Sequence, residues 1–245
     1  MLRLENISKA FGSLVVSNSV TLDVTAGQRH TIIGPNGAGK TTLINQIGGQ
    51  LSPDSGKIFL HGQEITRLSA PLRARAGLAR TFQKNTLFQA LSVFENVRLG
   101  AQAAHGRTYD LFRSWRSDTG VLAQAEQAIE QMNLGRIAAQ PVGKLSYGDL
   151  RQVEVAVALA TSPTVLLLDE PTSGLSPSET AQMIDVLRAL PREISILMIE
   201  HDMEVVFSIA DHITVLYYGE VIASGAPRNV ADDPRVQEVY LGAPQ

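Results

Sequence analysis

Apolar and polar residues alternate along the N-terminal part of the chain, and this pattern predicts β-strands. The alternation is clearest at residues 20–25, where Val, Leu and Val are separated by Thr, Asp and Thr, and apolar residues recur across residues 2–7. Because successive side chains of a strand point to opposite faces, each segment buries one face. A short apolar run at 30–33 predicts a further strand, and the spacing of residues 41–47 is compatible with a helix. The sequence therefore predicts antiparallel sheet that leads into a strand, a loop and a helix.

Helical periodicity replaces this pattern between about Leu87 and Ile137. Residues 92–95 (Ser-Val-Phe-Glu) have the spacing of a capping box, which predicts a helix that runs to about Ala104. An apolar stripe at helical spacing predicts another helix across residues 121–132. Since no strand interrupts this region, we expect a helical subdomain inserted into an α/β core.

The second half of the chain returns to alternating strands and helices. Apolar runs at 164–168 and 194–199 have the composition of buried strands in a parallel sheet. Between them, residues 176–179 (Ser-Pro-Ser-Glu) combine a cap, a proline at the first helical position and a capping glutamate, which predicts a helix through Leu190. The remaining predicted elements are strands at 213–217 and 220–223 and a short helical tail at 234–241.

Composition narrows the class of protein. The 245 residues are 44% hydrophobic and 18% charged, which is typical of a globular protein with ample core, and the net charge of −3 gives no reason to expect nucleic acid as a partner. The absence of cysteine excludes a disulfide scaffold and a thiolate metal site. Arg3 and Glu5 stand where a secretion signal needs an apolar run, and no apolar stretch is long enough to span a bilayer. We therefore expect a cytoplasmic protein whose membrane role depends on a partner.

The strongest single motif lies between the predicted strand at 30–33 and the following helix. Glycines in such a loop let backbone N–H groups point at phosphate oxygens, and the helix N-terminus adds partial positive charge. Lys40 would bridge the β- and γ-phosphates, and the Thr41 hydroxyl would hold Mg²⁺. The motif predicts a bound nucleoside triphosphate, and the alternative is a chance Gly-rich turn. Its residues match G-x-x-x-x-G-K-[ST] at every fixed position and are Gly34, Pro35, Asn36, Gly37, Ala38, Gly39, Lys40 and Thr41.

A second turn with anion-binding features, residues 145–149 (LSYGD), precedes a helix predicted to reach about Ala160. Ser146 can act as the N-cap of this helix, which is a purely structural role. Alternatively, Ser146 and the N–H groups near Gly148 offer an anion site at a helix N-terminus. If the Lys40 loop holds one end of a triphosphate, this turn is a candidate to hold the γ-phosphate bound to another subunit.

Polar residues follow several predicted strands, where they face the ligand crevice of an α/β sheet. Asp169 is a candidate for the Mg²⁺ shell and Glu170 for polarising a water molecule, and the alternative is a pair of solvated acids. His201 could donate to a γ-phosphate, although a lone histidine is usually structural. Gln83 could coordinate Mg²⁺ and orient water, or could be a surface residue. Phe11 could stack on a nucleobase or belong to the core.

Five landmarks stand in one order along the chain, and together they are far more specific than any one of them. They are GPNGAGKT at 34–41, Gln83, LSYGD at 145–149, LLLDEP at 166–171 and His201. This order and spacing resembles the ATP-binding-cassette (ABC) ATPases over essentially the whole chain. The form LSYG, the sequence EHDM at 200–203, the tail VQEVYLG at 236–242 and the insertion near 105–118 resemble the LivG-type ATPases of branched-chain amino acid importers.

The chain departs from the family pattern at two places. In the LSGGQ-type turn, Leu145, Ser146 and Gly148 match, whereas Tyr147 and Asp149 differ. At 173–176 the chain has SGLS where many members have SALD, so Ser176 replaces the usual Asp and the way in which two ATP sites communicate is not implied.

The resemblance implies a role for each matching residue. Phe11 would stack on adenine, Ser146 and Gly148 would contact the ATP of a second subunit, Glu170 would be the general base and His201 the γ-phosphate switch. The residues implied to bind ATP are Phe11, Gly34, Pro35, Asn36, Gly37, Ala38, Gly39, Lys40, Thr41, Thr42, Ser146 and Gly148. Those implied in catalysis are Lys40, Gln83, Glu170 and His201, and those implied to hold Mg²⁺ are Thr41, Gln83 and Asp169.

The resemblance also implies an α/β fold of the P-loop NTPase class, with a RecA-like core, an N-terminal antiparallel β subdomain and an inserted α-helical subdomain. The implied single domain spans residues 1–245, with 1–86 and 155–226 forming the β subdomain and core, 87–154 the helical subdomain and 227–245 a C-terminal tail.

The implied function is ATP hydrolysis in a head-to-tail dimer that drives import of branched-chain amino acids or a related solute. The implied cofactors are ATP and Mg²⁺. The implied partners are a second ATPase subunit, identical or homologous, transmembrane permease subunits and, indirectly, a substrate-binding protein, at the cytoplasmic face of the membrane. The alternative is the ATPase of a soluble machine such as iron–sulfur cluster assembly. The transported substrate does not contact such a subunit, so the sequence does not identify it, and import rather than export rests on analogy.

Overall fold

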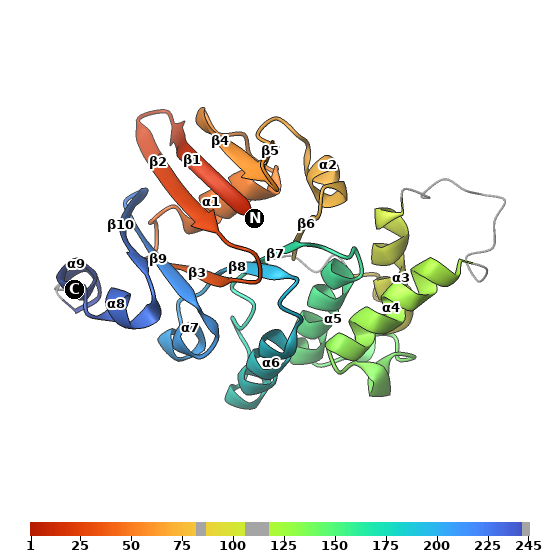
Figure 1. Ribbon diagram of the computed structural model, residues 1–245. Coiled ribbons are helices and arrows are strands. Elements are labelled where there is room, and N and C mark those ends of the chain that lie inside the picture. Colours follow the sequence, from red (N-terminus) through yellow and green to blue (C-terminus); the bar gives the residue numbers. More distant parts are fainter. Residues whose placement is uncertain (82–86, 106–117, 242–245) are drawn as a thin grey trace.

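Two β-sheets form the centre of the molecule (Figure 1), which the computed structural model describes for residues 1–81, 87–105 and 118–241. The first sheet is antiparallel and has the order β2 (Leu14–Val24), β1 (Leu2–Phe11), β4 (Ser55–Leu60) and β5 (Gln63–Glu64). The second sheet has the order β10 (Glu220–Gly225), β9 (His212–Tyr217), β3 (Arg29–Ile33), β8 (Ser195–Ile199), β7 (Val165–Asp169) and β6 (Leu78–Arg80). It is parallel except for β10, which pairs antiparallel with β9 at the edge.

The helices of the described part surround the second sheet. They are α1 (Lys40–Gly48), α2 (Ala70–Arg75), α3 (Val93–Ala104), α4 (Thr119–Gln131), α5 (Tyr147–Leu159), α6 (Pro177–Ala189), α7 (Met203–Ile209), α8 (Pro227–Ala231) and α9 (Pro234–Leu241). Two short 3₁₀ turns, η2 (Gly135–Ile137) and η3 (Val142–Lys144), precede α5. In the described part of the chain, no helix has the length and apolar character needed to cross a membrane.

The N-terminal strands form as the alternating pattern predicts. The apolar residues within 2–7 of β1 and 20–24 of β2 face inward and are at most 5% exposed: Leu2, Leu4, Ile7, Val20, Leu22 and Val24. They pack with α1 between the two sheets, so that α1 lies under the antiparallel sheet in Figure 1. The strand at 30–33 belongs to the second sheet, where β3 pairs parallel with β8 and β9. The predicted antiparallel sheet is thus confirmed, and the strand that leads into the loop lies in a separate, parallel layer.

Strand β7 lies between β8 and the edge strand β6, and its residues 165–168 are all apolar because helices cover both faces of the sheet. Val165 and Leu167 pack into the core that contains α1, whereas Leu166 and Leu168 pack into the core that contains α5 and α6. All four side chains are fully buried. This two-sided burial explains the unbroken apolar run.

The helical region forms as predicted. Ser92 and Glu95 make a reciprocal capping box at the start of α3, and the apolar stripe of α4 packs into a shared core with α3 and α5. The predicted insertion between strands β6 and β7 is therefore present, and Figure 1 shows α3 and α4 at one end of the molecule. The expected boundary after residue 154 falls inside α5, which continues to Leu159 and also contacts α6 and β6.

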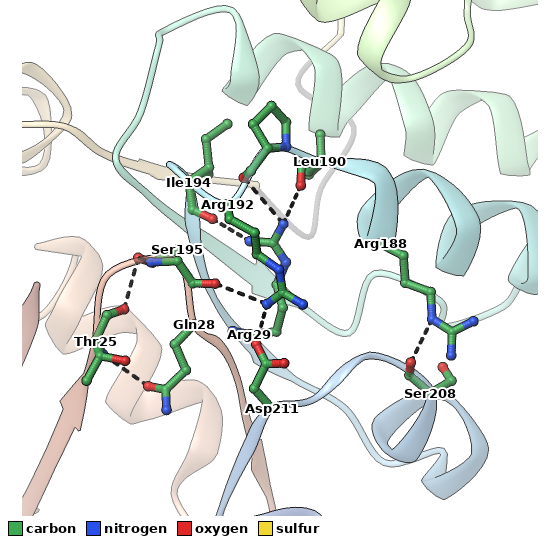
Figure 2. Close-up of polar contacts among 12 residues, drawn as sticks. Thr25, Gln28, Arg29, Arg188, Leu190, Arg192, Ile194, Ser195, Ser208 and Asp211 are labelled. Carbon is green, nitrogen blue, oxygen red and sulfur yellow. Dashed lines mark hydrogen bonds and ion pairs between the residues drawn. The ribbon is translucent and has the colours of Figure 1, made fainter.

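A buried arginine ties together the amino ends of the parallel strands (Figure 2). The Arg29 guanidinium donates to the carbonyl oxygens of Leu190, at 2.6 Å, and Ile194, and the Arg29 backbone N–H donates to Asp211 Oδ2 at 2.8 Å. Arg192 forms an ion pair with the same Asp211. Burial lowers the pKa of Arg29, and the carbonyl oxygens accept from its buried Nη1 and Nη2 groups. This network holds the end of the sheet opposite to the candidate site.

His30 makes the fold sensitive to acid. Its side chain is buried, its Nε2 lies 2.8 Å from Thr214 Oγ1, and its ring lies 4.7 Å from that of His212. Burial, and secondarily the nearby His212, lowers the pKa of His30 to about 3. The unfolded chain therefore takes up a proton near pH 6.5 that the folded chain does not, and stability falls as the pH drops below that value.

We expect His30 to reduce the free energy of unfolding by about 2 kcal/mol between pH 6.5 and pH 5. Urea unfolding at several pH values should show this loss in the wild type, and a smaller loss in His30→Gln. The exposed His105 provides the control, because His105→Gln should keep the wild-type slope. Equal slopes for wild type and His30→Gln would contradict the assignment.

Candidate active site

The Gly-rich loop joins β3 to α1 and fits tightly between β2 and the β9–β10 hairpin. Gly34 and Gly39 have positive φ values of 153° and 99°. A Cβ at Gly34 would lie 2.1 Å from the Leu216 carbonyl oxygen, and one at Gly39 would lie 2.2 Å from that of Val16. Only glycine fits at these two positions, because both the backbone conformation and the close approach exclude a side chain.

Lys40 begins α1 and closes the loop with its side chain. Its Nζ donates to the carbonyl oxygens of Gly34 at 2.7 Å and Pro35 at 3.0 Å. Burial lowers the pKa of Lys40, while Glu170 and Asp169 oppose the shift, so both carboxylates lie within electrostatic reach of this ammonium group. The first N–H groups of a helix have no intrahelical acceptor, and here they open onto the same loop. The arrangement offers an ammonium group and free backbone amides to an anion.

Asp169 ends β7 as a fully buried carboxylate, so the alternative of a solvated acid is wrong for this residue. Its Oδ2 accepts from Arg80 Nη2 at 3.2 Å, and both side chains are at most 9% exposed. Burial raises the pKa of Asp169, and the Arg80 guanidinium partly offsets that shift. Arg80 also donates to Asn45 Oδ1 at 2.7 Å, which links Asp169 to α1.

The oxygens present at this position fit a magnesium ion. Asp169 Oδ1 is buried without a hydrogen-bond partner among the described residues, and a hard cation would satisfy it. The same part of the chain contains no cluster of three acidic or histidine side chains that would form a complete metal cage. Mg²⁺ is usually held by one or two protein oxygens together with substrate phosphates. The Asp169 carboxylate and the exposed Thr41 hydroxyl, in the first turn of α1, can supply such protein oxygens.

Glu170 follows Asp169 in a left-handed backbone conformation, with φ of 49°. Such a conformation is uncommon outside glycine and turns the side chain away from the direction of the strand. A hydrogen bond from the Glu170 backbone N–H to the Ile199 carbonyl oxygen, at 3.0 Å, holds it in place. The Glu170 side chain is partly exposed, unlike that of Asp169. The two adjacent acids therefore occupy different environments, as their predicted roles require.

A third carboxylate, Glu200, connects the ends of β7 and β8. Glu200 is fully buried, and its Oε1 accepts from the backbone N–H and the hydroxyl of Thr172 at 3.1 and 2.7 Å. Its Oε2 accepts from the His201 backbone N–H at 3.2 Å. Burial raises the pKa of Glu200. Sequence reasoning gave Glu200 no role, although an acid directly after a buried strand and before His201 was a usable signal.

Strand pairing brings the predicted residues of three separate segments to one edge of the sheet. Register places Ile32 beside Ile199, and Ile199 beside Asp169, so the loop after β3, the residues after β8 and the acids after β7 follow at the same level. His201 is exposed at this edge. Gln83, which the sequence places after β6, lies outside the described residues.

Phe11 lies at the tip of the β1–β2 hairpin and is 52% exposed, so its alternative as a core residue is wrong. Lys9 Nζ lies 5.6 Å from the centre of its ring. The neighbouring pair Ala10 and Val15 leads directly to Val16, whose carbonyl oxygen packs against Gly39. Phe11 thus offers an exposed aromatic face close to the Gly-rich loop.

The turn at residues 145–149, called the LSYGD turn below, caps α5 with Ser146. Its structural role as an N-cap is therefore confirmed. In the described ranges, no hydrogen bond joins this turn to the Gly-rich loop of the same chain.

The C-terminal tail also reaches the Gly-rich loop, which sequence reasoning did not anticipate. The Tyr240 side chain, on α9, lies beside the Gly34 backbone, and partial burial raises its pKa to about 12 although it is still 41% exposed. A cavity of about 510 Å³ lies between residues 35–38 of the loop, the tyrosines of β9–β10 and Arg235 of α9. The tail, coloured dark blue in Figure 1, therefore packs beside the loop.

The sequence matches known proteins along its whole length. A family model described as "ABC transporter" matches residues 17–173, and one described as "Branched-chain amino acid ATP-binding cassette transporter" matches residues 220–244. The chain is 39% identical to the high-affinity branched-chain amino acid transport ATP-binding protein BraF of Pseudomonas aeruginosa, over 99% of this chain and 98% of the relative. It is 35% identical to LivG of Escherichia coli K12, with the same coverage of both chains.

Solved structures give the same result for the fold. A nucleotide-free ATP-binding cassette from an ABC transporter superposes with a TM-score of 0.85 at 30% identity, over 99% of both chains. The ADP conformation of an ATP-binding cassette superposes with a TM-score of 0.84 at 31% identity, again over 99% of both chains. The antiparallel sheet, the α/β core and the inserted helices are thus the arrangement found in these cassettes.

Proposed function

The chain belongs to the ABC transporter family of ATP-binding subunits, and from this premise we propose that it hydrolyses ATP to drive import of branched-chain amino acids. The observation that carries the choice of substrate is the match of residues 220–244 to the C-terminal model of branched-chain amino acid cassettes, together with full-length relatives of that kind. An ATPase of iron–sulfur cluster assembly is not favoured by these matches. The chain would work as a peripheral subunit at the cytoplasmic face of the membrane.

Two cassettes, identical or homologous, would close head-to-tail around two ATP molecules. In each site, Phe11 would stack on adenine, and residues 34–42 with Lys40 would hold the phosphates. The partner's LSYGD turn would complete the site. The exposed Phe11 ring and the free amides at the start of α1 support this arrangement. A site assembled only on closure couples chemistry to movement.

Within one site, the two acids after β7 would divide the work. Asp169, through its unpartnered Oδ1, and Thr41 would hold Mg²⁺, which supplies charge neutralisation to the phosphates. Glu170, turned aside by its left-handed backbone, would take the proton of the attacking water. His201, anchored through Glu200, would donate to the γ-phosphate. Gln83 is proposed from its sequence position alone, as a residue that senses both Mg²⁺ and the membrane subunit.

A groove of about 340 Å³ between the core and the helical region is the proposed docking site for the permease. Its walls come from α2, β6, α3 and α5. Most of the lining residues are apolar, and Glu154 also lines the groove. It runs beside Thr81 and Leu87, the residues that border the segment containing Gln83. A permease segment bound in this groove would contact both the α/β core and the helical region, which move relative to each other when the dimer closes.

We expect a charge placed in this groove to release the chain from its permease. Ala103 of α3 is exposed and lines the groove, so Ala103→Glu should abolish co-purification with the permease subunits from detergent-solubilised membranes while MgATP binding stays unchanged. Ala181→Glu, at an exposed alanine of α6 away from the groove, is the matched control.

The same purified complex tests the substrate. In proteoliposomes with the substrate-binding protein, leucine, isoleucine or valine should stimulate ATP hydrolysis and be imported. Recovery of the chain without any integral membrane protein, or stimulation only by an unrelated solute, would overturn the proposed function.

A further inference from the structure

The hydroxyl of Ser146 is already committed within its own turn. Ser146 Oγ accepts from the Asp149 backbone N–H at 3.1 Å and donates to Asp149 Oδ2 at 2.9 Å. A serine hydroxyl carries a single proton, so it has no second donor for another anion while this bond persists. The acceptor is a carboxylate, because Asp149 stands where the LSGGQ-type turn has a neutral glutamine.

The amide of Gly148 is committed as well, and again to a carboxylate. Its N–H donates to Glu179 Oε1 at 3.2 Å, across 31 residues of sequence. Glu179 lies in the first turn of α6, where its Oε2 accepts from the backbone N–H and the hydroxyl of Ser176 at 2.9 and 2.7 Å. These bonds, those from Ser176 foremost, lower the pKa of Glu179 and keep it ionised. A Cβ at Gly148 would lie 2.5 Å from Glu179 Oε1, so the carboxylate rests directly on this glycine.

Among the described residues, no salt bridge joins a cation to Asp149 or Glu179. Arg151, one turn along α5, donates through Nη1 to Glu154 Oε2 at 2.9 Å and through Nη2 to Tyr147 Oη at 2.7 Å. Its guanidinium is thus held by Glu154 and Tyr147. The surface of the LSYGD turn therefore presents two carboxylates bonded to the two groups, a hydroxyl and an amide, that an incoming phosphate would use.

We propose that Asp149 and Glu179 are positioning residues that guard the LSYGD turn against premature closure, so that the γ-phosphate of the partner's ATP must displace both carboxylates to bind Ser146 and Gly148. This inference rests on the proposed head-to-tail function. Closure exchanges two carboxylate contacts for phosphate contacts and brings like charges together as water leaves the interface. A triphosphate with its metal can make the exchange, whereas a nucleotide without a γ-phosphate has nothing to offer these donors.

Neutral isosteres test the proposal while keeping both helix caps. Asn and Gln can still accept the capping bonds of α5 and α6, so Asp149→Asn and Glu179→Gln should preserve the fold. In a Glu170→Gln background that blocks hydrolysis, sedimentation velocity would measure the MgATP concentration at which half of the protein is dimeric. We expect the double variant to lower this midpoint about tenfold and each single variant about threefold, as expected for removing like charge from a closing interface.

Two controls separate this effect from a change in fold or in overall charge. ADP binding to the monomer uses only the chain's own Gly-rich loop, so it should be unchanged in every variant. Glu126→Gln removes the same charge from an exposed position of α4, and Glu126 does not line the cavity that Asp149 borders. This control should leave the midpoint within twofold of its parent.

The outcomes distinguish this inference from the function on which it rests. Failure of every variant, including the Glu170→Gln parent, to form an MgATP-dependent dimer would overturn both. A dimer in the parent whose midpoint is unchanged or raised in Asp149→Asn and Glu179→Gln would overturn the guard and leave the head-to-tail function standing. A dimer that forms only after the carboxylates are neutralised would support the guard in its strongest form. Should the double variant lose ADP binding through misfolding, the single variants carry the same test.

Discussion

Replacing Glu170 with glutamine is expected to reduce ATP turnover by about 10²- to 10⁴-fold, the usual contribution of a general base. Glutamine has nearly the same shape but cannot accept the proton of the attacking water. Glu170 is turned out of the strand by its left-handed backbone, whereas the neighbouring Asp169 stays buried against Arg80. The loss should fall on kcat, while the affinity for MgATP changes little, because the phosphates are held by the loop and Lys40. Phosphate release under saturating MgATP measures kcat, and nucleotide titration measures the affinity for MgATP.

Glu193→Gln provides the matched control for that measurement, since Glu193 is exposed at the amino end of β8, away from the candidate site. It should retain wild-type turnover. If Glu170→Gln also hydrolysed ATP at the wild-type rate, Glu170 would not be the general base, and the separate roles proposed for Asp169 and Glu170 would be wrong. ADP binding by Glu170→Gln should match that of the wild type, which shows that its loop is intact.

Local patterns were sufficient to predict most helices and strands, because the interactions that begin and end these elements are local. Both capping boxes, at Ser92 and Ser176, join residues only three positions apart, and both form. The tail helix was predicted at 234–241 and is α9. Helix α7 was not predicted, because it is only seven residues long and its N-cap, Asp202, reads in the sequence as one of the polar residues that end the preceding strand.

The candidate site could be assembled from the sequence as a set of residues but not as a network. Strand-end acids and the Gly-rich loop are visible as motifs, and a parallel sheet must bring them to one edge. By contrast, Arg80 meets Asp169 across 89 residues, and Glu200 meets Thr172 across 28. No local periodicity encodes such pairs, because they depend on strand order and on the depth at which each side chain is buried. The contact of Gly148 with Glu179 is of the same kind.

Replacing Lys40 with alanine is expected to weaken MgATP binding and kcat/KM together by roughly 10²- to 10³-fold, the cost of removing one partner of a buried charge contact. In the structure the ammonium is folded back on the carbonyl oxygens of Gly34 and Pro35, and it would exchange them for phosphate oxygens. Lys40→Arg should be nearly as damaging, because the planar guanidinium cannot occupy the compact position between those two carbonyl groups. Nucleotide titration and steady-state phosphate release would measure both losses.

This pattern differs from that of Glu170→Gln, and the difference is what makes the pair of variants informative. Loss of the base leaves binding intact and stops the chemistry, whereas loss of the lysine removes an interaction that both the bound nucleotide and the transition state share. Lys57→Ala, on the exposed surface of β4 where Lys57 pairs with Glu64, should change neither quantity. If Lys40→Ala bound MgATP as tightly as the Lys57→Ala control, Lys40 would not contact the phosphates. The proposed phosphate-binding role of residues 34–42 would then be wrong for Lys40.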